Sequence, residues 1–155
     1  MLRIALRALG IDFGSKRIGI AISNEEMTVA TPISCIHRRS KKREDHQLIM
    51  DLAKEWEAEI LVVGLPRSLD GDLGPAAKNI IQEVELLQRN IGLPVETFDE
   101  RFTTVTARQV LRDQGIPEKE QKDLIDQVAA SIILQTWLDY KKGSSLSPSE
   151  MNNEL

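Results

Sequence analysis

The sequence has almost none of the residues that form disulfides, thiolate metal sites or membrane spans. Cys35 is the only cysteine among its 155 residues, which excludes an internal disulfide and a zinc site made of several thiolates. The two histidines, His37 and His46, have no further metal ligand at a suitable spacing. No window approaches the roughly 20 apolar residues that a membrane-spanning helix requires. We therefore expect a cytoplasmic protein without a membrane segment.

The sequence also contains fewer positively than negatively charged residues. The 20 Lys and Arg residues are outnumbered by 24 Asp and Glu residues, and the net charge is −4 at pH 7. Because Lys and Arg drive phosphate binding, this excess of acids argues against a protein that coats nucleic acid nonspecifically. Five basic residues are nevertheless concentrated between Arg38 and Arg43. Such a run is either a solvated loop or a surface that contacts phosphates.

The apolar pattern predicts strands first and an alternation of helices and strands afterwards. Two apolar runs within residues 8–24 predict a β-hairpin, and residues 28–36 predict a third strand, at an edge or a bulge because of Pro32. Further strands are expected at residues 60–65 and 95–99, and helices at 44–58, 75–89, from Thr103 or Thr104 to about 113, and 121–142. This order, β-β-β-α-β-α-β-α-α, predicts an α/β fold with a mixed five-stranded sheet and helices on both faces.

The two ends of the sequence differ from this pattern. The first seven residues contain arginines and no acids, and we expect them to belong to the fold or to lie directly before it. From Gly143 onward Ser, Pro, Asn and Glu dominate, which predicts a disordered tail over residues 143–155. The expected organisation is therefore a single domain over residues 1–142.

Acidic residues stand where the predicted elements should be apolar. Asp12 lies inside the first strand, Asp99 and Glu100 end the fifth strand, and Asp126 interrupts the last helix, with Asp123 one turn earlier. A carboxylate in apolar surroundings is costly unless it is protonated, hydrogen-bonded or bound to a cation. Mg²⁺ prefers carboxylate and water oxygens, which such a group could supply. The alternatives are an Asp12 that accepts hydrogen bonds from backbone amides and an Asp126 on a solvated helix edge.

Four segments resemble the motifs of one known family. The segment Gly10–Ala21, which reads GIDFGSKRIGIA, resembles the opening signature of the YqgF family, candidate Holliday-junction resolvases now usually described as pre-16S rRNA nucleases. The other matching segments are Val63–Pro66 with Asp70–Gly71, Asp99–Thr104 and Ile125–Ala130. They occur in the family's order and extend from about Arg7 to Tyr140. Together they are specific, although each alone is modest evidence.

The resemblance implies a ribonuclease H-like fold and a site for Mg²⁺ or Mn²⁺, with two ions when substrate is bound. It implies that Asp12, Asp126 and one of the acids Asp99 and Glu100 converge on this metal site. Adjacent strand residues point to opposite faces, so we expect only one of the two to bind metal, and we favour Asp99. Asp123 is added by analogy with bacterial resolvases, although the YqgF pattern does not require it.

Four basic residues are candidates for substrate binding. Lys16 and Arg17 lie in the predicted hairpin turn, Arg67 follows Pro66, and Arg101 directly follows the acid pair. Near a metal-bound phosphodiester, arginines could form bidentate contacts with phosphate. The alternatives are ordinary loop solvation for Lys16 and Arg67 and a structural salt bridge for Arg101.

The sequence therefore favours a metal-dependent endonuclease, a hydrolase that cuts structured RNA during maturation of the 5′ end of small-subunit ribosomal RNA. Resolution of branched DNA by a homodimer is the alternative within the same enzyme class, and the protein is expected to be a monomer or a homodimer. A catalytically idle RNA-binding or ribosome-associated factor is a second alternative, favoured by the acidic net charge. An actin-like ATPase shares the pattern Gly10-x-Asp12-x-Gly14, but its two lobes need a far longer chain.

Overall fold

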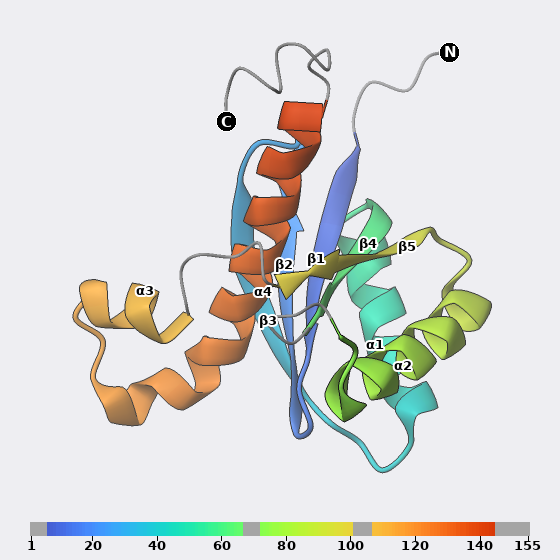
Figure 1. Cartoon of the computed structure of the whole chain (residues 1–155), viewed down its shortest axis with the longest axis horizontal. Helices are drawn as coiled ribbons and strands as arrows, with labels where there is room; N and C mark the ends of the chain where they lie inside the picture. Colours follow the sequence, from blue (N-terminus) through green and yellow to red (C-terminus); the bar gives the residue numbers. More distant parts are fainter. Residues whose placement is uncertain (1–5, 67–71, 101–106, 145–155) are drawn as a thin grey trace.

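A five-stranded mixed sheet forms the centre of the protein, and the computed structural model describes it within residues 6–66, 72–100 and 107–144 (Figure 1). Its strands are β1 (Arg7–Phe13), β2 (Arg17–Ser23), β3 (Ala30–His37), β4 (Ala58–Leu65) and β5 (Val95–Asp99). They lie in the order β3-β2-β1-β4-β5. The β1–β2 and β2–β3 pairs are antiparallel, whereas β1–β4 and β4–β5 are parallel. The predicted sheet is therefore confirmed.

Helices cover both faces of this sheet, as the element order predicted (Figure 1). They are α1 (Lys42–Glu55), α2 (Pro75–Ile91), α3 (Ala107–Asp113) and α4 (Glu118–Ser144). Leu9, Ile11 and Val63 belong to the apolar core under α1 and α2, whereas Ala8 and Val62 belong to the core under α4. Because side chains alternate along β1, Asp12 faces α4 together with Ala8. No helix in the described ranges is long and apolar enough to cross a membrane.

The element boundaries differ from the predicted ones mainly around α3 and α4. Helix α3 begins at Ala107, and the expected caps Thr103 and Thr104 lie outside the described residues. Helix α4 begins directly after Pro117 and continues through Ser144, two residues into the predicted tail. One glycine costs a helix only about 1 kcal/mol, so Gly143 does not end it. Residues 145–155 and 1–5 lie outside the described ranges, and the expectations for the two ends remain predictions.

Helix α4 lies unusually close to the sheet where glycines replace side chains. A Cβ atom on Gly10 of β1 would lie 2.7 Å from the Leu134 Cβ of α4. A Cβ atom on Gly19 of β2 would overlap the main-chain carbonyl of Asp126. Gly19 is also the cross-strand partner of Asp12. The absence of a side chain at Gly19 therefore brings the backbone of Asp126 to the strand position opposite Asp12.

We expect Gly19→Ala to lower the free energy of unfolding by about 1–3 kcal/mol, because a methyl group there would force α4 away from β2. Urea denaturation measures the change. Gly143→Ala is the matched control, since a Cβ on Gly143 meets no atom within 4 Å, and it should be neutral or slightly stabilising. Equal free energies for wild type and Gly19→Ala would contradict the close approach.

Candidate active site

The carboxyl of Asp12 has a strongly perturbed pKa. Burial raises the pKa of this carboxyl most, and together with the charges of Glu100 and Asp126 it brings the pKa from 3.8 to about 7. The carboxyl lies on the α4 face of β1, one residue before the end of the strand. The structure thus places the predicted acids Glu100 and Asp126 within electrostatic range of Asp12.

Glu100, rather than the favoured Asp99, is the acid that β5 brings to this face. Phe98 packs in the core under α4, so strand alternation directs the following Asp99 toward the opposite face. A Cβ on Gly64 of β4 would lie 2.7 Å from Glu100 Oε1 and 2.5 Å from Ile133 Cδ1 of α4. Burial raises the pKa of Glu100, and the charge of Asp99 raises it further. Glu100 therefore lies on the face that carries Asp12, and the expectation that Asp99 binds the metal stays a prediction.

Asp126 is held by an arginine from the hairpin turn. Arg17 Nε donates a hydrogen bond of 2.6 Å to Asp126 Oδ2. Both side chains are partly exposed, at 31% for Arg17 and 16% for Asp126. The turn itself is closed by a hydrogen bond of 2.9 Å from Gly14 N to the Arg17 carbonyl. The predicted substrate-binding Arg17 is thus placed at the acids, with one of them as its partner.

The chemistry of these acids fits a divalent cation, although the carboxylates are not arranged as a closed cluster. Within the described residues no three carboxylate, imidazole or thiolate groups stand close enough together to hold one metal ion. The carboxylates of Asp12 and Glu100 are nevertheless partly buried, and their negative charges repel each other. A divalent cation would relieve this repulsion and replace the protons that the raised pKa values retain.

The remaining predicted site residues contribute less information. Lys16 lies in the β1–β2 turn with an exposed side chain. Arg67 and Arg101 lie outside the described residues. Asp123 lies on α4, but its side chain is outside the described part of the structure. Nothing in the described residues therefore assigns a role to these four beyond what the sequence suggested.

A buried ion-pair network on the other face of the hairpin escaped prediction. Arg38 donates hydrogen bonds of 2.6 and 2.9 Å to the two carboxylate oxygens of Glu83 and a third, of 3.4 Å, to Asp45. His46 Nε2 lies 2.9 Å from Glu83 Oε2. Burial acts to raise the pKa of Glu83, but hydrogen bonds from His46 and Arg38 together with their charges lower it to about 2. Arg38 therefore stabilises the fold through buried ion pairs, and it differs in this from the exposed basic residues of the run 38–43, such as Lys41 and Lys42.

A family model described as Holliday junction resolvase matches residues 6–140. A relative from Mycobacterium sp. (strain KMS), named as a candidate pre-16S rRNA nuclease, is 43% identical over 145 residues, which cover 93% of this chain and 86% of the relative. A relative of the same name from Halothermothrix orenii is 40% identical over 136 residues, which cover 88% of this chain and 96% of the relative. The resemblance inferred from the four motifs is thus confirmed.

The structure of T. thermophilus RuvC in complex with a Holliday junction substrate has a TM-score of 0.63 at 15% sequence identity. The match covers 92% of this chain and 99% of that chain. This likeness confirms the predicted ribonuclease H-like fold, and the relatives confirm the predicted nuclease class. By its match over residues 6–140, the chain belongs to the RuvX family, which is described as Holliday junction resolvase.

Proposed function

We propose that the protein is a divalent-metal-dependent endonuclease that hydrolyses phosphodiester bonds in structured nucleic acid. The observation that carries this proposal is the position of Asp12 opposite Gly19, where the backbone of Asp126 approaches the sheet and the charges of Glu100 and Asp126 act on the Asp12 carboxyl. These acids come from β1, the end of β5 and α4, and the close packing of α4 on Gly19 brings two of them together. Acids whose pKa values are strongly perturbed by burial and by neighbouring charges are typical of catalytic centres.

In this mechanism Asp12, Glu100 and Asp126 would hold Mg²⁺ or Mn²⁺. Two bound cations of this kind act as Lewis acids, lower the pKa of the attacking water and stabilise the leaving oxygen. The guanidinium of Arg17 is partly exposed, so a substrate phosphate could replace the Asp126 carboxylate as its partner. That exchange would free Asp126 for the cation and fix the phosphodiester beside Asp12.

The substrate that fits best is precursor ribosomal RNA, cut near the 5′ end of the small-subunit RNA. Relatives with 40% or higher identity carry names for this activity. Branched DNA is the second candidate, favoured by the family description. A non-catalytic role in ribosome assembly would agree with the net charge of −4. A non-catalytic role would not explain why the carboxyl of Asp12 is held where its pKa is raised.

Asp12→Asn should abolish cleavage while leaving the fold intact, because the amide keeps the shape of the carboxyl and removes its charge. The assay incubates purified protein with a precursor of 16S rRNA and with a four-way DNA junction, each with Mg²⁺, Mn²⁺ or a chelator. We expect cut RNA in the presence of metal and a rate loss of at least a thousandfold in the variant. Preferential cutting of the junction would shift the substrate to branched DNA, and metal-independent products would refute the proposed site.

Glu100→Gln should reduce cleavage far more than Asp99→Asn, because Glu100 is the neighbour whose charge acts on Asp12. The two substitutions are matched, since each removes one negative charge at adjacent positions. Rates under single-turnover conditions provide the comparison. A larger loss with Asp99→Asn would restore the original preference for Asp99.

The stability of the metal-free protein should fall as pH rises from about 4 to about 7, the interval between the unfolded and folded pKa values of Asp12. An acid with a raised pKa holds its proton more tightly in the folded protein, so raising the pH through that interval removes stability. Urea denaturation at several pH values measures the slope. The charged groups that face Asp12 are Glu100 and Asp126, and Arg17 is paired with the latter.

Asp12→Asn should flatten this slope, because its side chain does not ionise. Millimolar Mg²⁺ at pH 7.5 should raise the melting temperature of the wild type more than that of the variant, since the cation binds only the folded state. If the variant destabilises the metal-free protein and responds to Mg²⁺ like the wild type, Asp12 is a structural residue and the proposed site is wrong.

A further inference from the structure

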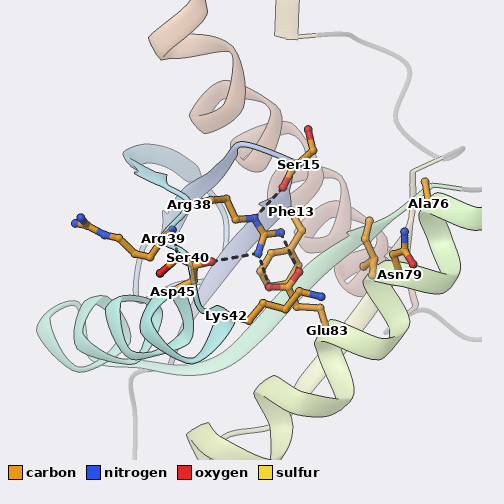
Figure 2. A pocket seen from close by; sticks show the side chains of 12 residues that line it. Phe13, Ser15, Arg38, Arg39, Ser40, Lys42, Asp45, Ala76, Asn79 and Glu83 are labelled. Atoms are coloured by element: carbon orange, nitrogen blue, oxygen red, sulfur yellow. Dashed lines mark hydrogen bonds and ion pairs between the residues drawn. The ribbon is translucent and has the colours of Figure 1, made fainter.

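A pocket of about 540 Å³ is lined by residues from the end of β1, the β1–β2 turn, the start of α1 and the first turns of α2 (Figure 2). Phe13, Gly14 and Ser15, the three residues that follow Asp12, form part of its wall. Phe13 packs in the core under α1 and α2, so its side chain points to the opposite face from that of Asp12. The pocket and the acids therefore lie on either side of one strand end, next to the same hairpin turn.

The wall of this pocket is fixed before any ligand arrives. The guanidinium of Arg38 lies over the Phe13 ring, with its central carbon 5.3 Å from the ring centroid. Figure 2 shows it held between the carboxylates of Asp45 and Glu83. These carboxylates are nearly inaccessible to solvent, at 1% and 4% exposure. Arg38 therefore offers a flat, pre-positioned surface whose charge is already balanced.

The rest of the pocket combines cations with polar and apolar groups. Lys42, in the first turn of α1, and Arg39 contribute positive charge, and the side chain of Lys42 is exposed. Asn79 and Ser15 contribute groups that donate and accept hydrogen bonds, and Ile80 contributes apolar surface. A volume of this size falls within the roughly 300–1,000 Å³ of small-ligand sites.

We propose that this pocket binds one nucleotide of the substrate strand, adjacent to the bond that the acids cleave. The base would stack on the Arg38 guanidinium and pair its edge with Asn79, while Lys42 would contact the phosphate. Stacking on flat side chains and hydrogen bonding to base edges are how proteins hold unpaired nucleotides. The strand would then pass over the β1–β2 turn, between Asp12 and the pocket. This inference rests on the proposed nuclease function.

Blocking the pocket tests the inference most directly. Ala76 is exposed on α2 and lines the pocket, so the tryptophan side chain in Ala76→Trp should fill the pocket without disturbing the core. Gln82→Trp is the matched control, because Gln82 is exposed on the same helix and does not line the pocket. Fluorescence anisotropy in the Asp12→Asn background with Mg²⁺ gives the Kd for labelled single-stranded RNA and DNA. We expect Ala76→Trp to raise the Kd at least tenfold and Gln82→Trp to leave it unchanged.

A second pair of variants tests the phosphate contact without adding bulk. Lys42→Gln should weaken binding several-fold and reduce the slope of log K against log salt by about 0.7, the value for one lost contact to a single strand. Lys41→Gln removes the same charge from the preceding exposed residue, which does not line the pocket, and should change both quantities less. Equal effects of the two substitutions would mean that only general charge attraction operates, and the pocket proposal would be wrong.

The identity of the ligand is tested with small probes. The side-chain amide resonance of Asn79 should shift on addition of a nucleoside 5′-monophosphate and should not shift with inorganic phosphate alone. An equal shift with phosphate would overturn the proposed base contact. Wild-type protein that cuts neither nucleic acid would refute the nuclease function itself. Metal-dependent cleavage together with unchanged binding in Ala76→Trp would refute only the pocket.

Discussion

The close approach of α4 to the β1–β2 hairpin is the constraint on which the active site depends. Three of the acids that the sequence singles out belong to separate elements, and only the packing of these elements can bring them together. At Gly19 the helix backbone occupies the volume that a side chain would take, so Asp126 lies beside the strand partner of Asp12. At Gly64 of β4 the missing side chain likewise leaves room for the side chains of Glu100 and of Ile133 from α4. The glycines thus determine the distance between the acids.

The pKa values of the acids on the two faces of the hairpin are shifted in opposite directions. On the α4 face, burial and neighbouring charges raise the pKa of Asp12 to about 7. On the other face, the side chain of Glu83 is only 4% exposed, yet hydrogen bonds from His46 and Arg38 lower its pKa to about 2 despite burial. The difference lies in the partners, because only Glu83 has two nitrogen donors at hydrogen-bond distance. Hydrogen bonds from cationic side chains therefore keep Glu83 ionised, whereas burial and neighbouring negative charges favour the protonated form of Asp12.

Much of the fold could be predicted from the sequence, because apolar periodicity and turn residues report directly on strands and helices. Asp12 and Asp126 stood out for the same reason, as charges inside apolar runs. The choice between Asp99 and Glu100 could not be made, because the strand ends at Asp99 and Glu100 already begins a turn. The role of Arg38 was hidden in a run of similar charges, and its partner Glu83 lies 45 residues away. The signal that could have revealed it was Glu83 itself, an acid within the apolar stripe of α2.

Arg38 also connects the wall of the pocket to the β1–β2 turn through two hydrogen bonds. Its backbone N–H donates to the Lys16 carbonyl at 2.9 Å, and its Nε donates to the Gly14 carbonyl at 3.0 Å. The turn that presents Arg17 to Asp126 is thus fastened to the residue that forms the wall of the pocket. A ligand that moves Arg38 would move this turn, and thermodynamic linkage requires the effect to be reciprocal. A ligand in the pocket would then change the affinity of the acids for a cation, and a bound cation would change the affinity of the pocket by the same factor. The β1–β2 hairpin would couple the two binding equilibria.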